Sequence, residues 1–228
     1  PALRTRFMGE LLATYNVWGA FWVNIELTFF SAIGALILGT FVAILRIAPS
    51  APLRAAGTAY GNIVRNTPLT LIILGCWLVL WGQLGVNVSK DLKTNNFWMA
   101  VIGLSVYTAA FVCESLRSGF NTVPVGQAEA ARSIGLDFRQ TVSLVVLPQA
   151  FRGAIAPLGN TLIALTKNST VAAAASVLQA STVMQQMIEF SPDQGLAIFM
   201  VIALGFVIIV FPMGVIFTYL SKRLKVAR

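Results

Sequence analysis

The chain has 228 residues, of which 57% are hydrophobic and only 11% are charged, and it carries a formal net charge of +8 at pH 7. A soluble globular domain is about one quarter charged, so this composition excludes an ordinary soluble protein and predicts an integral membrane protein. The chain has no histidine, and no glycine precedes a lysine, so a P-loop is absent and the chain by itself cannot hydrolyse ATP.

The positions of the basic residues and of the two cysteines argue against nucleic-acid binding, a metal site and a disulfide. Most basic residues flank apolar segments, which indicates membrane orientation rather than nucleic-acid binding. Cys76 and Cys113 lie inside apolar segments without metal-ligand spacing, so we expect neither a metal site nor a disulfide. We find no cleavable signal peptide and expect the apolar segments themselves to direct insertion.

Five apolar segments are long enough to cross about 30 Å of hydrocarbon, for which about 20 residues suffice. They cover residues 19–45, 60–81, 97–116, 153–177 and 195–220. An interfacial segment with tryptophans precedes the first of them, and a connector at residues 179–194 precedes the last. The sequence therefore predicts an all-α integral membrane fold with five transmembrane helices.

The first apolar segment carries a repeat of small residues and two polar residues near its start. Ala35, Gly39 and Ala43 recur every four residues, and such a stripe lets a second helix approach closely. Asn24 and Glu26 lie near the first turns, at headgroup level. We expect these two to form an interfacial polar pair.

Polar residues also occur in the second and third segments. Pro68 follows Arg65, Asn66 and Thr67 and removes a backbone donor, so the freed polar backbone must be lined by protein or water. At the end of the third segment Glu114 and Arg117 are three residues apart and can pair on one helix face. We expect this pair to be structural.

A polar loop at residues 119–150 separates the third and fourth segments. We expect a first short helix over residues 124–134, capped by Asn121 or Thr122 and ended by Gly135 in a left-handed conformation. A second helix should start at a capping box of Asp137 and Gln140, and Pro148 should kink or end it. By composition alone the loop is more typical of a solvated connector than of a docking element.

The fourth segment is interrupted by Pro157, Gly159 and a polar run at residues 166–170 that contains Lys167. An ionisable residue at membrane depth is costly unless it faces a cavity, a partner or water. The run therefore indicates a broken helix that lines a cavity. The alternative is a lysine that pairs with an acidic neighbour only to hold helices together.

The spacing in the loop resembles a known signature. Glu-Ala-Ala at 129–131, then three residues, Gly135, nine residues, Val145, one residue and Leu-Pro at 147–148 resembles the signature loop of permease subunits of binding-protein-dependent ABC importers. Val145 stands where that family usually has isoleucine. Segments 65–68, 114–117, 126–127, 148–150 and 167–170 are similar to its polar amino-acid uptake branch.

This resemblance implies a type I ABC importer permease, with residues 1–228 forming a single transmembrane domain in the cytoplasmic membrane of a bacterium. Two ATPase subunits, a second permease chain and an extracytoplasmic amino-acid-binding protein are the implied partners. ATP and magnesium would be bound by the ATPase subunits, with no cofactor and no catalytic residue on this chain. The 129–148 loop would act as the coupling helix that sits in a groove of the ATPase, through Gly126, Ala128, Glu129, Ala130, Ala131 and Gly135.

The basic residues predict the orientation. If the loop is cytoplasmic, that side collects eleven of them, namely Arg46, Arg54, Arg65, Arg117, Arg132, Arg139, Arg152, Lys222, Arg223, Lys225 and Arg228. The outer side has four, Arg4, Arg6, Lys90 and Lys93. This bias predicts an outside N-terminus and a cytoplasmic C-terminus.

Matching segments of the polar amino-acid permeases approach the transported molecule, which implicates Asn66, Thr67, Lys167, Asn168 and Ser169 as pathway residues. Many relatives have aspartate in place of Asn168. With asparagine there, the charge of Lys167 is unopposed, and acidic substrates are favoured at low local dielectric. The stretches 31–34, 64–70 and 162–168 look most like glutamate permease subunits.

Two other functions compete with the importer. An ion-coupled secondary amino-acid transporter would need inverted repeats and usually an intramembrane carboxylate, and neither is evident in the sequence. A membrane adaptor that only docks a soluble partner would not require the polar run at residues 166–170. One five-span chain also cannot enclose a pathway by itself, which favours pairing with a second permease.

Overall fold

The computed structural model describes residues 9, 10 and 12–224, so Arg4, Arg6, Lys225 and Arg228 of the charge count lie outside the described residues. Within those ranges the chain contains helices and no strand. They are α2 (Val17–Ile47), α3 (Ala51–Arg65), α4 (Leu69–Gly75), η1 (Cys76–Gln83), α5 (Leu92–Asn121), α6 (Val125–Ser133), α7 (Phe138–Gln140), η2 (Thr141–Val146), α8 (Leu147–Asn168), η3 (Ser169–Ala175), α9 (Ala180–Phe190), η4 (Pro192–Gln194) and α10 (Gly195–Leu224).

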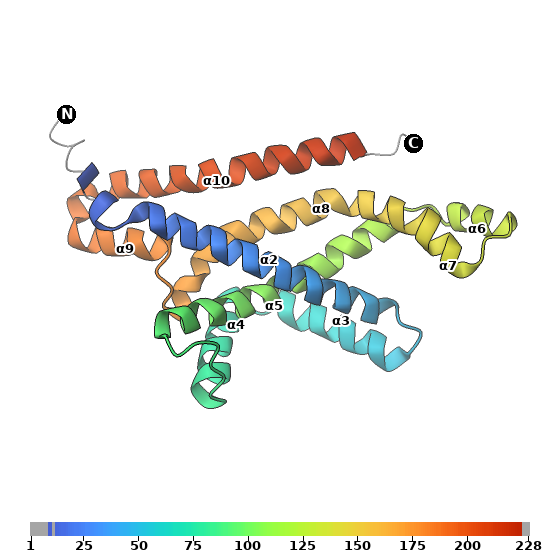
Figure 1. Cartoon of the computed structure of the whole chain (residues 1–228), viewed down its shortest axis with the longest axis horizontal. Coiled ribbons are helices and arrows are strands. Elements are labelled where there is room, and N and C mark those ends of the chain that lie inside the picture. The colour runs from blue at the N-terminus through green and yellow to red at the C-terminus, as the bar shows by residue number, and fades with distance from the viewer. Residues whose placement is uncertain (1–8, 11, 225–228) are drawn as a thin grey trace.

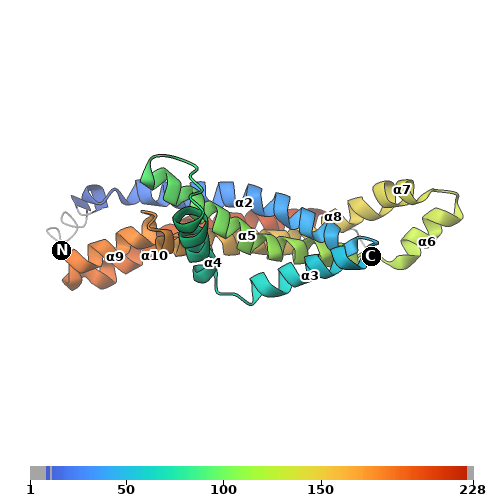
Figure 2. The same cartoon turned by 90° about the horizontal axis from the view of Figure 1, so that it is seen from below.

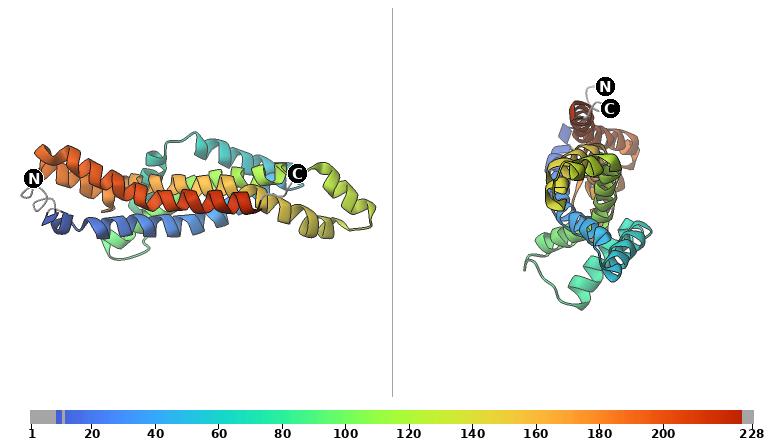
Figure 3. Two further views of the ribbon diagram at one scale, coloured as in Figure 1. Left: turned by 90° about the horizontal axis from the view of Figure 1, so that it is seen from above. Right: turned by 90° about the vertical axis from the view of Figure 1, so that its right-hand side faces the viewer.

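The long helices α2, α5, α8 and α10 run along the long axis of the molecule (Figure 1). The start of α2 and the end of α10 lie at opposite ends of the molecule. The α6–α7 hairpin extends beyond the other helices at the end where α10 finishes, and this is visible from below and from above (Figures 2 and 3). Four helices of the described chain are long and apolar enough to span a membrane, or up to five if the bent pair α3 with α4–η1 counts as one.

A second helix packs on the small-residue stripe of α2, as the sequence predicts, and this helix is α5. Ala35 is completely buried. A Cβ on Gly39 would lie 2.6 Å from Cβ of Val112 and 2.8 Å from the carbonyl oxygen of Ala109. The two helices approach closely because Gly39 has no side chain, so Val112 and the backbone of α5 pack directly against α2 at this point.

The second predicted span is not one straight helix. The chain bends by 108° between α3 and the α4–η1 segment, and α3 begins at Ala51, well before the predicted start at residue 60. Pro68 has no backbone N–H, and its ring disfavours the α conformation for Thr67, so α3 ends at Arg65 and α4 starts afresh after Pro68. The predicted second span is therefore a broken one, and the break lies at the polar run before Pro68, where the sequence predicted freed backbone groups.

The fourth predicted span begins earlier than residue 153. A helical run continues from Phe138 to Ala175, with η2 as a π-helical turn directly before Pro148. Pro148 thus sits in the first turn of α8, where its missing N–H is tolerated. Pro157 lies inside α8, and α-helical geometry changes to a 3-10 helix only at Ser169.

The predicted connector at residues 179–194 is mostly helical, since α9 and η4 fill it. Buried side chains of α2, α4, α5, α8 and η3 form the main core around Leu27, Ile73, Leu104 and Leu165. A second cluster joins the start of α2 to α9 and α10. Both clusters include α2, which therefore ties the two halves of the bundle together.

Candidate functional site

The α6–α7 hairpin owes its shape to two local signals. Gly135 has φ +90°, the N–H of Leu136 donates to the Ala131 carbonyl at 3.2 Å, and the N–H of Gly135 donates to Arg132 at 3.0 Å. These two bonds form a Schellman ending of α6. Asp137 and Gln140 then exchange capping-box bonds of 2.8 and 3.0 Å, as predicted.

The predicted cap of α6 was wrong. Helix α5 continues to Asn121, and the Thr122 hydroxyl donates to the Gly119 carbonyl at 2.7 Å instead of capping α6. Pro124 occupies the N-cap position, and no side chain bonds to the first turn. Those first N–H groups of α6 therefore remain available to water or to a partner.

The residues predicted to contact an ATPase divide between two sides of α6. Gly126, Glu129, Ala130 and Gly135 are exposed and Ala128 is half-buried, whereas Ala131 is only 5% exposed. Since α6 packs on η2, Ala131 supports the hairpin from within and presents little surface to a partner. Around the exposed residues lie three large apolar side chains that are 75–80% exposed, Val125, Ile134 and Phe138.

A buried polar junction holds η3 and α9 against α2. Asn24 is completely buried, and Glu26 accepts from Trp22 Nε1 at 3.0 Å instead, so the predicted interfacial pair of Asn24 and Glu26 was wrong. Asn24 Nδ2 donates to Ser169 Oγ at 2.7 Å and to Gln179 Oε1 at 3.3 Å, and its Oδ1 accepts from the Ala180 N–H at 3.0 Å. One amide thus satisfies polar groups on both sides of the bend that follows η3.

Ser169, predicted as a pathway residue, is part of this buried junction. Ser169 is completely buried, and its hydroxyl also donates to the Thr166 carbonyl at 2.7 Å. This side chain has no surface on which to contact a ligand in this structure. Its geometry suits holding the start of η3 in place.

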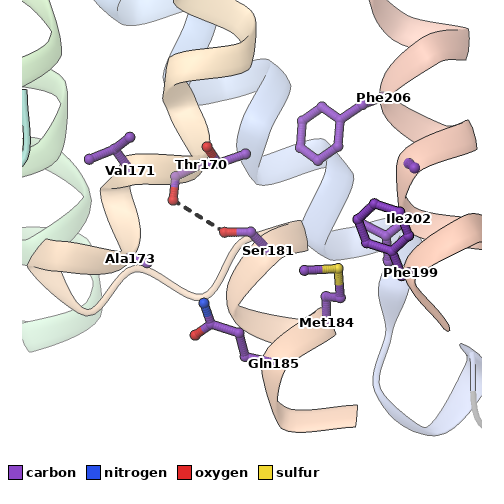
Figure 4. Close-up of a pocket in the computed structure, with 10 residues that line it drawn as sticks. Thr170, Val171, Ala173, Ser181, Met184, Gln185, Phe199, Ile202 and Phe206 are labelled. Atoms are coloured by element: carbon purple, nitrogen blue, oxygen red, sulfur yellow. Dashed lines mark hydrogen bonds between the residues drawn. The ribbon is translucent and has the colours of Figure 1, made fainter. Parts of the chain in front are cut away.

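Next to the junction, η3, α9 and α10 line an open pocket of about 290 Å³ (Figure 4). Its polar edge is formed by Thr170 and Ser181, and the Ser181 hydroxyl donates to the Thr170 carbonyl at 3.2 Å. Ile202 and Phe206 of α10 and Met184 of α9 form its apolar lining. This pocket is mainly apolar, so it suits packing better than recognition of a charged ligand.

Lys167 and Asn168 are adjacent in sequence but line different pockets. Lys167 is exposed and borders a pocket with Phe206 and Val210 of α10. No acidic group among the described residues pairs with it. The alternative of a structural pair for Lys167 therefore finds no partner within the described chain.

Asn168 lines a pocket between α8 and α5 together with Asn160, Tyr107 and Thr108. Asn160 and Asn168 are eight residues apart, a spacing that keeps both within the width of one helix face. Within this pocket Thr161 Oγ1 lies 3.0 Å from Ser115 Oγ. Sequence reasoning missed Asn160 and Tyr107, although the spacing of Asn160 and Asn168 was a signal that could have found this face.

Asn66 and Thr67 lie at the 108° bend. Asn66 Nδ2 donates to the Asn62 carbonyl at 2.7 Å, and Thr67 Oγ1 donates to the Ile63 carbonyl at 2.8 Å, so both side chains satisfy the frayed end of α3. The following helix α4 packs on η3. The structure thus brings the bend near the 3-10 segment that begins at Ser169, as two parts of the same core.

Glu114 lies at the centre of an arginine cluster that extends beyond the predicted pair. Arg117 Nη1 is 3.4 Å from Glu114 Oε2, while Arg46 Nη1 donates to Oε1 of the same carboxylate. Arg65 Nη2 lies 3.6 Å from Oε1. The carboxylate therefore links α2, α3 and α5, and the predicted pair is only one of its three contacts.

Among residues 9, 10 and 12–224, no group of three or more His, Cys, Asp or Glu side chains could hold a metal ion. The free thiols of Cys76 and Cys113 lie on η1 and α5.

Outside the helical spans, Asp91 accepts hydrogen bonds from the hydroxyl and the N–H of Thr94, at 2.7 and 2.9 Å, and these bonds lower the pKa of its carboxyl. That carboxylate caps the start of α5.

Comparison with known proteins identifies a matching protein family and several similar proteins. Residues 35–226 match the model of the binding-protein-dependent transport system inner membrane component. The chain is 50% identical over 214 residues to the glutamate transport system permease protein GluC of Corynebacterium glutamicum, covering 92% of this chain and 94% of that protein. It is 34% identical to the probable glutamine ABC transporter permease protein GlnM of Bacillus subtilis, covering 84% and 85%.

The fold is similar to that of a solved structure described as "Crystal structure of an amino acid ABC transporter with histidines". Its TM-score is 0.82 at 22% identity, and the match covers 97% of both chains. At this identity the similarity concerns the fold alone.

Proposed function

This chain belongs to the family of binding-protein-dependent transport system inner membrane components, and from that membership we propose that it is the transmembrane subunit of an ATP-driven glutamate importer. As a multi-pass membrane permease of the amino-acid ABC class, it is not a secondary transporter. We infer glutamate as the substrate from the similarity to the glutamate permease GluC over nearly the whole chain.

A second permease chain completes the pathway. The exposed side chains of α10 support this. Only 11% of its most apolar stretch is buried within the chain, and Val207, Ile208 and Phe211 are 56–68% exposed. Part of this surface meets lipid and part meets the partner. Two ATPase subunits, which bind ATP and magnesium, and an extracytoplasmic glutamate-binding protein complete the importer, and this chain binds no cofactor itself.

The α6–α7 hairpin couples ATP hydrolysis to transport. Its exposed Glu129 and Arg132 and the apolar Val125, Ile134 and Phe138 place charges of both signs among exposed apolar side chains, a combination that suits a groove on a partner protein. Residues 1–228 form one transmembrane domain, and the 119–150 loop is its cytoplasmic element. The positive-inside bias supports this orientation, with the N-terminus outside and the C-terminus in the cytoplasm.

Glutamate passes along the faces of α8 that carry Lys167 and Asn168, near the bend at Asn66 and Thr67. An anionic ligand is supported by the charges, because Lys167 has no acidic partner among the described residues and the Asn160–Asn168 pocket has no carboxylate. At low dielectric an unpaired lysine attracts the substrate carboxylates. Ser169 acts indirectly by holding the start of η3.

Uptake of labelled glutamate by membrane vesicles that contain the assembled importer tests this function. ATP-dependent uptake should require the binding protein and a functional ATPase subunit, and excess aspartate should compete better than arginine. Uptake driven by a sodium or proton gradient without ATP would refute the importer. ATP-dependent uptake that prefers arginine would retain the importer and refute the anionic substrate.

A further inference from the structure

An arginine-lined pocket lies at the end of the bundle where α2 turns into α3. Its volume is about 530 Å³, and Arg46, Arg54 and Arg117 line it together with Thr58, Asn62 and two alanines of α3. Three helices contribute to it, since Arg46 belongs to α2, Arg117 to α5 and the other residues to α3. The glutamate pathway proposed above does not use this pocket.

The glycines of α3 make space for the most buried of these arginines. A Cβ on Gly57 would lie 2.8 Å from Cγ of Arg46, and a Cβ on Gly61 would lie 3.7 Å from its Nη1. The side chain of Arg46 is only 12% exposed, so α3 holds it in a defined position. The guanidinium is therefore preorganised at the wall of the pocket.

The pocket carries more positive than negative charge. Glu114 is the single carboxylate that meets Arg46, Arg65 and Arg117 in the described chain, which leaves two of these three positive charges uncompensated. Arg54 adds another, because its Nη1 donates only to the carbonyls of Ala48 and Pro49, at 2.8 and 2.7 Å. This excess favours an anionic ligand.

Many guanidinium N–H groups in the pocket have no acceptor among the described residues. Each guanidinium has five donors, yet Arg46 and Arg117 bond to Glu114 only through Nη1, and Arg54 also uses only Nη1. The remaining donors form the planar fork that matches the oxygens of a phosphate group.

The position and the lining favour a lipid over a protein. Arg46 directly follows the apolar run that ends α2, which places its guanidinium at headgroup depth. Protein interfaces are enriched in large aromatic and methionine side chains at their centre, and this pocket has none. Basic pockets between membrane helices are known to bind anionic headgroups. We propose that this pocket binds the phosphate of an anionic phospholipid headgroup.

A bound headgroup would neutralise the excess charge and join the α2–α3 turn to α5. Helix α5 leads directly into the α6–α7 hairpin at this end of the molecule (Figure 1). The lipid thus braces the base of the hairpin. Anionic lipid should accordingly raise the melting temperature of the assembled transporter.

The test uses the purified complete transporter in nanodiscs of phosphatidylcholine, with or without phosphatidylglycerol. Retained lipid is counted by native mass spectrometry, and the melting temperature is measured in both. The natural chain should retain phosphatidylglycerol and melt higher in its presence. The double variant Arg54→Gln with Arg117→Gln should retain about tenfold less, as expected for lost charged hydrogen bonds, while Arg223→Gln on α10 serves as the matched control and should retain it fully.

A second variant guards against a folding defect. Thr58→Glu places a carboxylate inside the pocket, so it should abolish the effect of phosphatidylglycerol while keeping or raising the melting temperature in phosphatidylcholine. Unchanged lipid retention in either pocket variant would overturn the proposal. An equal stabilisation by inorganic phosphate in nanodiscs of phosphatidylcholine alone would also overturn it. So would loss of the ATPase subunits from variants that still retain phosphatidylglycerol, which would assign the pocket to a protein partner.

Discussion

Replacing Asn24 with leucine tests the buried junction between α2, η3 and α9. The change removes the bonds from Nδ2 to Ser169 and Gln179 and the bond that Oδ1 accepts from Ala180. Ser169 still donates to the Thr166 carbonyl, and Gln179 Oε1 still accepts from the Ser181 N–H. The N–H of Ala180 is the group left buried without an acceptor.

The structure gives the size of the expected loss. An orphaned buried N–H costs about 1–3 kcal/mol, and each of the two other lost bonds contributes about 0.5–1.5 kcal/mol. Burial of the leucine side chain offsets part of this loss, so we expect the free energy of unfolding to fall by about 2–4 kcal/mol. By the usual scaling for a chain of this size, the melting temperature should fall by roughly 5–15 °C.

Thr28→Val is the matched control for the assay, a thermal melt of the purified importer in detergent. Thr28 lies one turn further along α2 and donates only to the carbonyl of Asn24 at 2.8 Å, so its replacement should change the free energy of unfolding by less than about 1 kcal/mol. Asn24→Asp should also destabilise, because it sets a second acceptor against Gln179 Oε1. If Asn24→Leu melts within the range of Thr28→Val, the junction does not stabilise the bundle and the reasoning is refuted.

Three further predictions concern transport and packing. Asn168→Asp should lower glutamate uptake about tenfold, since a new carboxylate in its pocket repels an anionic substrate by about 1–3 kcal/mol at an effective dielectric near 20; unchanged initial rates per assembled complex would place specificity elsewhere. Glu129→Lys should lower ATP-driven uptake while the amount of complex recovered by affinity purification stays normal, and full uptake would refute its coupling role. Gly39→Val should lower the melting temperature by several degrees through overpacking against Val112, whereas an unchanged melt would mean that α2 and α5 separate without cost.

Much of this protein follows from sequence because the signals are local. Apolar runs of sufficient length predict membrane helices whatever their neighbours. The positive φ of Gly135 and the capping box of Asp137 and Gln140 involve residues three to five positions apart, so they form wherever the chain places them. The four-residue spacing of Ala35 and Gly39 likewise predicted that a second helix would approach α2, although not that this helix would be α5.

The tertiary structure decided what depends on residues far apart in the chain. Asn24 has the sequence environment of an interfacial residue, but the packing of η3 and α9 buries it. Glu114 pairs locally with Arg117, but the fold brings Arg46 to the same carboxylate across 68 positions. Lys167 and Asn168 are neighbours in sequence, yet about 100° of helical rotation separates them and directs them into different pockets. Composition and spacing predict helices, whereas only packing determines which face of each helix meets protein, lipid or substrate.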